Sequence, residues 1–519
     1  MASKVAPSSP AQLVELLAGR GLRSLKEFLA RQRWFAAKAR AIESVAIEDW
    51  TALDAEAPIV LLLLKIDGER YYVPLSVCAS TVAERADVIS DFGAQVLVDA
   101  HSDPDLGRHL LSAMAANREL SGGAGRFVCR SLPPLAGRLG EFQLGSASRR
   151  ISGEQSNTSV VFDRTLILKS IRRPQRGVNP ELEVLHFLTS RTQFRDVPNL
   201  VGWLEYVGSS EDSATLAVLQ GFIENAGDGW QYTVTALEVA LGGPRERGRA
   251  QAARASRAAT PDFLAADMRT LGEVTGGLHA ALASNPGVPD FSPEPIMRQD
   301  VDRWSARIAE EVETLIADIG AAGSDSLPDL GAIQGLLRES GPQIDRTVAG
   351  LGVLASPGTH KIRVHGDYHL GQVLKTRDGF SILDFEGEPA RPLEERRAKQ
   401  PPLRDVAGML RSLSYAAHTV ARARRVPRPA RELGWLADWE ARARDAFLGG
   451  YLESAEKSPV RLCPSSIDEV RRACAALELE KVCYEVRYEL NTRPDWLSIP
   501  ARGLARLLGL EGDYYRLTG

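Results

Sequence analysis

The stretch VHGDYHLGQVL, residues 364–374, gathers two histidines, an aspartate, a tyrosine, a glutamine and two glycines between apolar residues. A second stretch, ILDFEGEP at residues 382–389, follows it and adds three more carboxylates. The apolar residues predict buried strands or anchored loops, with the polar residues at the ends of these segments. The pattern H-G-D-x-x-x-x-Q, followed ten residues later by I-L-D-F-E, favours a functional site over a purely structural hydrogen-bond network.

Three side chains of these stretches, Asp367, Gln372 and Asp384, offer the oxygen ligands that Mg²⁺ prefers. A divalent ion beside a free carboxylate is what phosphoryl transfer to a hydroxyl group requires. The ion neutralises phosphate oxygens, and the carboxylate accepts or orients the proton. A zinc site made of His365 and His369 is the weaker alternative, because a glycine interrupts their segment and no helix is expected there.

A polar turn upstream, in ISGEQSNTSVVF at residues 151–162, is suited to phosphate binding, although it matches no standard nucleotide-binding loop. Backbone N–H groups and hydroxyl groups are the expected donors. The candidates are Gly153, Ser156, Asn157, Thr158 and Ser159.

Lys169 ends the apolar run RTLILKSI, residues 164–171, where a charge is costly unless it is paired. The following helix is expected to begin at Pro180, since proline suits a first helical turn. We expect Glu183 of this helix to be the ion-pair partner of Lys169, with Glu181 as the alternative. The competing interpretation is a surface lysine and an unrelated helix glutamate.

Composition indicates a globular chain. Of its 519 residues, 44% are hydrophobic and 25% charged, and the net charge of −4 gives no reason to expect a nucleic-acid partner. The five cysteines are scattered, which favours a reducing compartment over a disulfide framework or a zinc site. No run of 18 apolar residues and no apolar leader is present, so we expect a cytoplasmic protein without membrane contact.

The order of predicted elements suggests three parts. Residues 1–125 combine helix with antiparallel strands and end at the glycine-rich SGGAGRF, residues 126–224 are rich in strands, and residues 225–519 are mainly helical. Two arginine-rich segments, 242–260 and 421–431, are interpreted as solvated insertions, with anion or partner binding as the alternative.

These motifs, in this order, resemble the aminoglycoside-phosphotransferase-like branch of the protein-kinase fold. The resemblance narrows to bacterial maltokinases, which occur alone or fused to trehalose synthase. It is carried from residue 31 to about residue 500 by RQRWFAAKAR, EQSNTSVVF, NPELE, LQGFIENAGDGWQYT, VHGDYHLGQVL, ILDFEGEPARPLEERRAKQPPLRDVAGMLRS and YELNTRPDWLSIP. It implies an α+β, bilobal protein-kinase-like fold with an N-terminal α/β cap subdomain (1–125), a nucleotide-binding N-lobe (126–224) and a helical C-lobe (225–519).

The same resemblance implies transfer of the γ-phosphate of ATP to the anomeric hydroxyl of maltose, giving maltose 1-phosphate for α-glucan (glycogen) synthesis. Asp367 would then be the catalytic base, with Gln372 and Asp384 as Mg²⁺ ligands. The residues implied to meet ATP are Ser156, Asn157, Thr158, Lys169, Glu183, Gln220, Phe222 and Ile223. Lys169 would hold phosphates with Glu183 positioning it, and residues 220–223 would form the hinge that meets adenine.

The segment LELEKVCYEVRYEL, residues 477–490, is expected to supply sugar contacts. Lys481, Tyr484, Glu485 and Tyr488 fall at i, i+3, i+4 and i+7, on one helical face. Such a stripe can also be a packing surface, and the family likeness favours the sugar-contacting role. Asp405, with its neighbour Arg404, is interpreted as structural, and Asp405 is expected to tie down the loop of Asp367.

Two other functions stay open. A kinase of glucosamine or an aminoglycoside would use the same chemistry, with Glu485 and Glu489 facing the ammonium group. A non-catalytic sugar- or nucleotide-binding scaffold would be expected to lack Asp367, Asp384 or Lys169, which are all present. We expect no trehalose-synthase domain beside the kinase in these 519 residues, and an association with a separate synthase is only a hypothesis.

Overall fold

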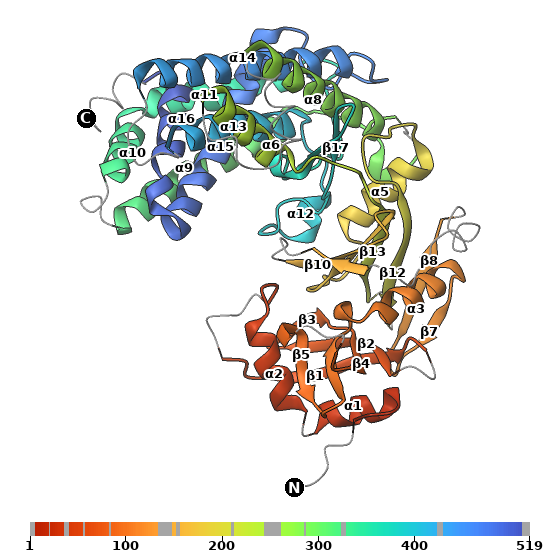
Figure 1. Cartoon of the computed structure of the whole chain (residues 1–519). Coiled ribbons are helices and arrows are strands. Elements are labelled where there is room, and N and C mark those ends of the chain that lie inside the picture. The colour runs from red at the N-terminus through yellow and green to blue at the C-terminus, as the bar shows by residue number, and fades with distance from the viewer. Residues whose placement is uncertain are drawn as a thin grey trace. The chain divides into compact units, whose positions relative to one another are not determined.

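The computed structural model describes residues 6–19, 21–35, 41–54, 58–81, 85–132, 148–151, 156–208, 212–242, 261–284, 287–322, 328–422 and 429–510. The chain divides into two compact units (Figure 1). Unit 1 comprises residues 1–189 and 198–224, and unit 2 comprises residues 190–197 and 225–519. None of the described helices is long and apolar enough to cross a membrane.

Unit 1 begins with a sheet of six described strands in the order β1-β2-β4-β6-β5, with β3 paired to β2. Helices α1 (Pro10–Ala18) and α2 (Leu22–Arg31) precede it. The strands are β1 (Val45–Ala52), β2 (Ile59–Ile66), β3 (Glu69–Tyr72), β4 (Leu75–Ala79), β5 (Val88–Asp91) and β6 (Gln95–Asp99). All their recorded pairings are antiparallel.

Strand β2, IVLLLLKI, is apolar at nearly every position, and its place between two hydrophobic clusters explains this. Side chains alternate between the two faces of a strand. Val60, Leu62 and Leu64 belong to one hydrophobic cluster, together with side chains of α1 and α2. Leu61 and Leu63 belong to a second cluster, which also contains side chains of the strands beyond residue 125. The strand is therefore buried on both faces.

A second sheet, of seven described strands, has the order β7-β8-β12-β13-β11-β10-β9. Its strands are β7 (Glu119–Ser121), β8 (Arg126–Ser131), β9 (Ser148–Arg150), β10 (Asn157–Phe162), β11 (Leu166–Ile171), β12 (Leu200–Val207) and β13 (Ser213–Gly221). Helix α3 (Pro104–Ala115) precedes the sheet along the chain, and α5 (Pro180–Arg191) lies between β11 and β12.

The two sheets of unit 1 share a core. One cluster contains Leu63 of the first sheet, Leu110 of α3 and Leu168 of the second sheet. The expected boundary near residue 125 falls between β7 and β8, which pair with each other. The cap and N-lobe expected from the sequence thus lie in one compact unit, and their separation into two domains stays a prediction.

Unit 2 is mainly helical, and it contains the two-stranded hairpin β16 (Val373–Lys375) and β17 (Phe380–Ile382) and the short pair β14 (Glu294–Pro295) and β15 (His360–Lys361). Its helices are α6 (Gly229–Ala240), α8 (Pro261–Leu282), α9 (Arg298–Ala322), α10 (Pro328–Glu339), α11 (Gly341–Ala349), α12 (Leu393–Arg397), α13 (Leu403–Arg422), α14 (Ala430–Ala455), α15 (Ile467–Thr492) and α16 (Ser498–Leu508). The α+β composition predicted from the sequence is confirmed.

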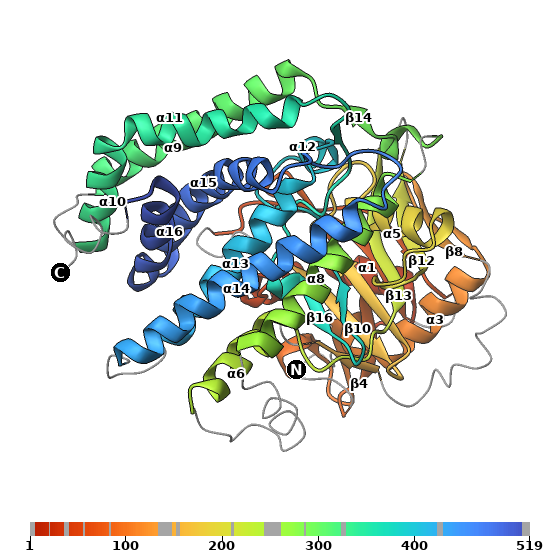
Figure 2. The ribbon, with the colours of Figure 1, turned by 90° about the horizontal axis from the view of Figure 1, so that it is seen from above.

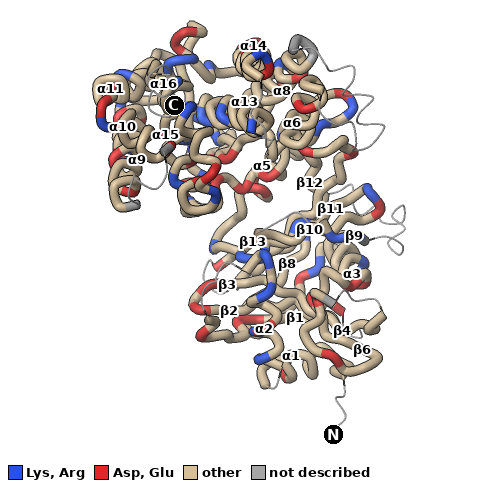
Figure 3. Tube along the Cα trace, turned by 60° about the vertical axis from the view of Figure 1, so that its left-hand side comes forward, with Lys and Arg blue, Asp and Glu red and all other residues tan. Residues whose placement is uncertain are grey.

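Helices α8 and α14 pack against each other over much of their length (Figure 2). Glycines allow this approach, since a Cβ atom at Gly272 would collide with the backbone of Phe447, and one at Gly450 with the backbone of Arg269. Lys and Arg positions are interspersed with Asp and Glu positions in both units (Figure 3). Gly153 and most of the two arginine-rich segments, residues 243–260 and 423–428, lie outside the described residues.

A buried cluster of charged and polar side chains lies in unit 1. His101 Nδ1 is 2.6 Å from Asp99 Oδ1, and His101 Nε2 is 2.7 Å from Ser170 Oγ. The side chains of Asp99 and His101 are fully buried. Burial, assisted by the nearby positive charge of Arg172, lowers the pKa of His101 to about 4. His101 is therefore neutral in the folded chain at neutral pH.

We predict that unit 1 loses stability as the pH falls from about 6.5 towards 4. In this range the unfolded chain binds a proton on His101, whose ordinary pKa is about 6.5, and the folded chain does not. The loss from this group is on the order of 2 kcal/mol at pH 5. Unfolding free energies of wild type and His101→Gln, measured between pH 7 and 5, test this. The variant should show a shallower pH dependence, and parallel curves would contradict the assignment.

Candidate active site

The loop that contains Asp367 is held by a buried carboxylate on α13. Asp405 accepts hydrogen bonds from the backbone N–H of His365 (2.7 Å) and of Gly366 (2.9 Å). Gly366 has φ +86°, a left-handed conformation that favours glycine. The expectation that Asp405 ties down this loop is confirmed.

Asp405 also fixes neighbouring helices. His279 Nε2 of α8 lies 3.0 Å from Asp405 Oδ2, and His279 Nδ1 lies 3.2 Å from the hydroxyl of Tyr451 on α14. Burial alone would raise the pKa of Asp405, but the contact with His279 and the loop N–H groups lowers it below its usual range. A charged carboxylate thus anchors the loop from within the helical core.

His365 joins the two stretches quoted from the sequence. Its Nε2 lies 2.8 Å from the carbonyl oxygen of Leu383, and its ring packs against Tyr368 and Phe385. His369 accepts a hydrogen bond from the N–H of Gly371 at Nδ1 (3.0 Å). Both rings therefore support the backbone, which argues against the two-histidine zinc site.

The two residues expected to bind metal are neighbours. Gln372 immediately precedes β16 and Asp384 follows β17, so the hairpin brings them together. Gln372 Nε2 donates to Asp384 Oδ2 at 2.9 Å, and Asp384 has φ +64°, an uncommon conformation for a residue other than glycine. The half-buried amide and carboxylate oxygens fit a Mg²⁺ ion.

In unit 1, Lys169 forms an ion pair with Glu181, and the preference for Glu183 is corrected. Lys169 Nζ lies 2.5 Å from Glu181 Oε2, and both side chains are buried. Glu183 is two residues further along α5, which turns its side chain by about 200° to another face of the helix. Glu183 is half-buried and has other interactions. The sequence distance to Lys169 could not distinguish the two glutamates.

The other predicted nucleotide residues lie on adjoining strands of unit 1. Ser156 is exposed just before β10, while Asn157 and Thr158 are buried at its start. In the antiparallel register Thr158 faces Ser170, next to Lys169. Gln220, near the end of β13, pairs with Ile167 of β11.

At the end of β13 the chain turns out of the sheet. The N–H of Phe222 donates to the carbonyl oxygen of Thr165 at 2.8 Å, and Ile223 follows it. Gln220 Oε1 is buried and has no hydrogen-bond partner among the described residues. The proposed adenine hinge therefore adjoins the strand of Lys169, with an unused buried acceptor at Gln220.

A pocket of about 480 Å³ in unit 2 is lined by every residue predicted to meet a sugar. These are Asp367, Lys481, Tyr484, Glu485 and Tyr488. Its volume lies within the range of about 300–1,000 Å³ that is usual for small-molecule sites. The helical stripe on α15 therefore faces a cavity that also contains the candidate base.

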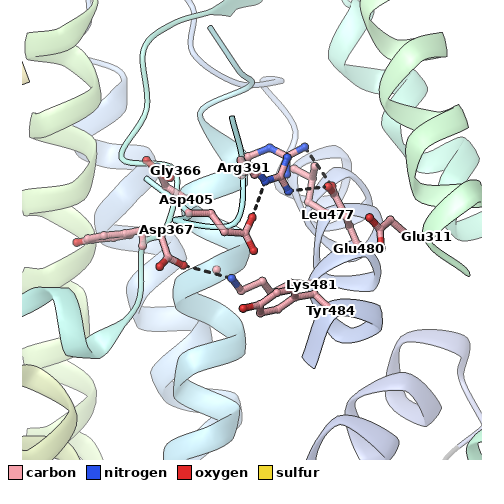
Figure 4. A pocket seen from close by; sticks show the side chains of 13 residues that line it. Glu311, Gly366, Asp367, Arg391, Asp405, Leu477, Glu480, Lys481 and Tyr484 are labelled. Carbon is pink, nitrogen blue, oxygen red and sulfur yellow. Dashed lines mark hydrogen bonds and ion pairs between the residues drawn. The ribbon is translucent and has the colours of Figure 1, made fainter. Parts of the chain in front are cut away.

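Lys481 links α15 to the loop of Asp367. Its Nζ lies 3.3 Å from Asp367 Oδ1 and 4.8 Å from the centre of the Tyr484 ring. Figure 4 shows the lysine pointing towards the aspartate. Burial alone would lower the pKa of Lys481, but the negative charge of Asp367 raises it above its usual value. Lys481 is therefore a protonated partner of Asp367.

A smaller polar pocket, also drawn in Figure 4, shares Asp367 and Lys481 with the larger one. Glu480 lies in its wall and pairs with Arg391 (3.3 Å) and Arg404 (3.0 Å). Burial opposes ionisation of Glu480, but these arginines lower its pKa to about 2. The ion pair of Arg404 agrees with the structural role expected for it.

The pocket also contains aromatic faces. The rings of Tyr484 and Tyr488 are stacked, with centroids 6.2 Å apart and planes inclined by 23°. Tyr488 is 45% exposed, which is high for a large aromatic residue. The guanidinium group of Arg493 lies over the rings of Tyr488 (5.5 Å) and Trp496 (4.5 Å).

Glu485 lines the pocket but is already paired. Arg411 Nη2 lies 2.7 Å from Glu485 Oε2, and both side chains are almost completely buried. Burial raises the pKa of Glu485, and Arg411 opposes this effect. Glu489, which is buried, pairs with the partly exposed Arg493 (2.7 Å). A direct sugar contact by Glu485 stays a prediction.

Several lining residues were not predicted from the sequence. They are Asp228, Trp230, His369, Tyr415, Glu489 and Arg493, of which Glu489 is expected from the sequence only in an amino-sugar site. Asp228 also caps α6, accepting a hydrogen bond from the N–H of Gln231 at 2.7 Å. The adjacent Gly-Trp dipeptide at the start of that helix is a signal that could have indicated Trp230. Tyr415 lies 74 residues from Glu489, whose carboxylate it contacts, and nothing local indicated it.

We predict that Asp405→Asn destabilises the folded chain by about 3 kcal/mol, because an amide cannot replace the charge that His279 and two backbone N–H groups stabilise. Denaturant unfolding measures the change. Asp438→Asn is the matched control, since Asp438 is about half exposed and, among the described residues, pairs only with Arg442 on the same helix. Equal stability of the two variants would contradict the role given to Asp405.

Comparison with known families identifies two regions. Residues 28–103 match the maltokinase N-terminal cap domain, and residues 148–464 match the phosphotransferase enzyme family known as APH. The second match covers more than half of the chain. The loop of Asp367 and the hairpin that precedes Asp384 both lie within it.

Proteins with similar sequences include two that are named glucosamine kinases. The protein from Streptacidiphilus jiangxiensis is 27% identical over 403 residues, covering 77% of this chain and 80% of the relative. The protein from Mycolicibacterium smegmatis is 28% identical over 366 residues, covering 70% and 81%.

A solved structure of a glucosamine kinase in complex with glucosamine, ADP and inorganic phosphate matches with a TM-score of 0.63 at 23% identity. The match covers 93% of this chain and 99% of that one. At this identity the likeness establishes the fold, and the predicted kinase-like fold with an N-terminal cap is confirmed.

The family match covers the segments that contain Lys169, the candidate base Asp367 and the candidate oxygen ligands. It also bears out the likeness to maltokinases that the motifs indicated. The chain belongs to the phosphotransferase enzyme family, as a maltokinase-like phosphotransferase whose acceptor is a hydroxyl group.

Proposed function

We propose that this sugar kinase transfers the γ-phosphoryl group of ATP to the anomeric hydroxyl of maltose, giving maltose 1-phosphate for α-glucan synthesis. One observation carries the proposal. Asp367 shares a pocket with Lys481 and the stacked rings of Tyr484 and Tyr488, whereas the glutamates of that pocket are paired with arginines.

Asp367 acts as the base in this proposal. Lys481 occupies Oδ1, and within the described part of the chain no hydrogen bond reaches Oδ2. The acceptor hydroxyl oxygen forms a bond to the γ-phosphorus, the bond from that phosphorus to the β–γ bridging oxygen breaks, and the hydroxyl proton passes to Asp367 Oδ2. The loop position fixed by Asp405 keeps this oxygen in place.

Gln372 and Asp384 would hold Mg²⁺ in the proposed enzyme. The donor set fits, because their side chains lie together and provide amide and carboxylate oxygens. When bound, the ion supplies positive charge that neutralises the phosphate oxygens.

In unit 1 the proposed ATP contacts are Lys169, with Glu181 holding its ammonium group, and the predicted residues Ser156, Asn157, Thr158, Gln220, Phe222 and Ile223. The buried ion pair supports this role, because a lysine held in one orientation presents a fixed charge. Glu183 is not part of this proposal.

The state of the pocket carboxylates supports a neutral sugar. An ammonium group needs an uncompensated carboxylate nearby, and Glu485 and Glu489 each have an arginine partner. A neutral sugar can place a C–H face on Tyr484 or Tyr488 and direct its hydroxyl groups to Lys481 and the surrounding polar atoms.

An amino sugar is the second candidate acceptor. The two relatives compared above are named glucosamine kinases. The pocket also contains the carboxylate of Asp228, which has no ion pair among the described residues. Family membership and the presence of Asp367, Asp384 and Lys169 argue against a non-catalytic scaffold. A cytoplasmic location and an association with a separate trehalose synthase stay predictions.

We predict ADP release from Mg·ATP with maltose as acceptor, and much less with glucose, glucosamine or kanamycin. The measurement is steady-state turnover with ³¹P NMR of the product, where maltose should give an anomeric phosphate signal. Turnover on glucosamine with none on maltose would reject the proposed acceptor and favour the amino-sugar kinase. Phosphorylation of maltose at a non-anomeric hydroxyl would reject the proposed position.

Replacing Asp367 by asparagine should lower turnover by at least about 10²-fold, because the amide cannot accept the hydroxyl proton. Binding of Mg·ADP, measured by calorimetry, should stay within a factor of about two. Asp378→Asn is the control, since Asp378 is exposed in the turn between β16 and β17. Turnover of Asp367→Asn close to that of the control would remove Asp367 from the proposed mechanism.

A further inference from the structure

We propose that Arg172 is a positioning residue for the nucleotide, through which the N-terminal cap holds β11 and the start of β10 in place. The cap is taken as residues 28–103, the range of the matched cap domain. The inference rests on the proposed function, because it assumes that Lys169 of β11 and Thr158 of β10 meet ATP.

Arg172 directly follows β11 and is completely buried. Its guanidinium group lies near His101 and the carbonyl oxygen of Tyr72, and three further contacts join separate parts of unit 1. Nε donates to Thr158 Oγ1 at 2.8 Å, Nη2 donates to Asp99 Oδ2 at 2.5 Å, and the group lies 4.6 Å from the centre of the Trp34 ring. Thr158 belongs to the proposed nucleotide site, whereas Asp99 and Trp34 belong to the cap.

The backbone reinforces the same connection. The N–H of Tyr72, in the cap strand β3, donates to the carbonyl oxygen of Arg172 at 2.9 Å. His101 of the cap contacts Ser170, which lies between Lys169 and the end of β11, at 2.7 Å. The cap therefore contacts Ser170 of β11 and Arg172 directly after it, both within three residues of Lys169.

Burying the charged side chain of Arg172 carries a desolvation cost. Burial lowers the pKa of Arg172 and works against its charge, and the carboxylate of Asp99 opposes this effect. An apolar side chain would avoid the desolvation cost, but it would form no directional hydrogen bonds to the neighbouring strands. Hydrogen bonds to Asp99 and Thr158 specify where β10 and β11 lie, and a misplacement of about 1 Å at a reacting group can strongly reduce rate.

The experiment compares Arg172→Met, Arg172→Lys and Arg70→Met, with calorimetric binding of Mg·ADP as the readout. Arg70 of β3 is the matched control. It joins the cap to Asp212 (2.7 Å), just before β13, and also pairs with Glu48, and among the described residues it forms no hydrogen bond or ion pair with β10 or β11. Thermal unfolding of each variant records the loss of stability separately.

We expect Arg172→Met to weaken Mg·ADP binding by about tenfold or more, and Arg172→Lys to recover part of that loss. Arg70→Met should bind Mg·ADP as wild type does, even if its unfolding temperature falls by a similar amount. Equal nucleotide binding by Arg172→Met and Arg70→Met would overturn the inference. If Arg172→Met does not fold, Asp99→Asn is used instead, with the same expected weakening and the same outcome overturning the inference.

Lys169→Met separates this inference from the proposed function. If Lys169→Met leaves Mg·ADP binding unchanged, the nucleotide role of Lys169 fails, and the positioning role of Arg172 fails with it. If Lys169→Met weakens binding and Arg172→Met does not, only the role of Arg172 is rejected.

Discussion

The hydrogen bonds of the buried Asp405 carboxylate are the interaction on which the candidate active site depends. A charge removed from water must be matched by donors in defined directions, and here the donors are two loop N–H groups and His279. Those bonds hold the loop of Asp367 against helices α8 and α13, and His279 extends the contact to α14. The packed helices thus fix the position of the polar loop, and the proposed base Asp367 faces the pocket in one orientation.

Buried charged side chains with charged partners also occur at other places in the molecule. Lys169 pairs with Glu181, Arg172 with Asp99, and Arg411 with Glu485, all with buried side chains. Such pairs add little net stability, because desolvation offsets the attraction between the charges. Ion pairs have preferred directions, whereas apolar contacts do not. The hydrophobic clusters of unit 1 stabilise the sheets, and the ion pairs then specify where particular side chains lie.

The proposed acceptor pocket also contains charged side chains that are paired. Its lysine is engaged with Asp367, and two of its glutamates are engaged with arginines, so the lining is polar without a large uncompensated charge. The stacked tyrosines add flat apolar faces. A polar, nearly neutral wall with aromatic faces suits a ligand rich in hydroxyl groups. Asp228 at the start of α6 is the exception, and it is the feature that keeps an amino sugar in consideration.

Local sequence alone determined the α+β composition, the closeness of Gln372 and Asp384 beside the loop of Asp367, and the stripe of Lys481, Tyr484 and Tyr488 on one helical face. Each depends on spacing within a few residues, which backbone periodicity converts directly into geometry. Only the tertiary structure decided that Glu181 faces Lys169, that Arg411 neutralises Glu485 from 74 residues away, and that the cap shares its core with the second sheet. These outcomes depend on helix rotation and on packing between distant segments, and sequence spacing does not encode either one.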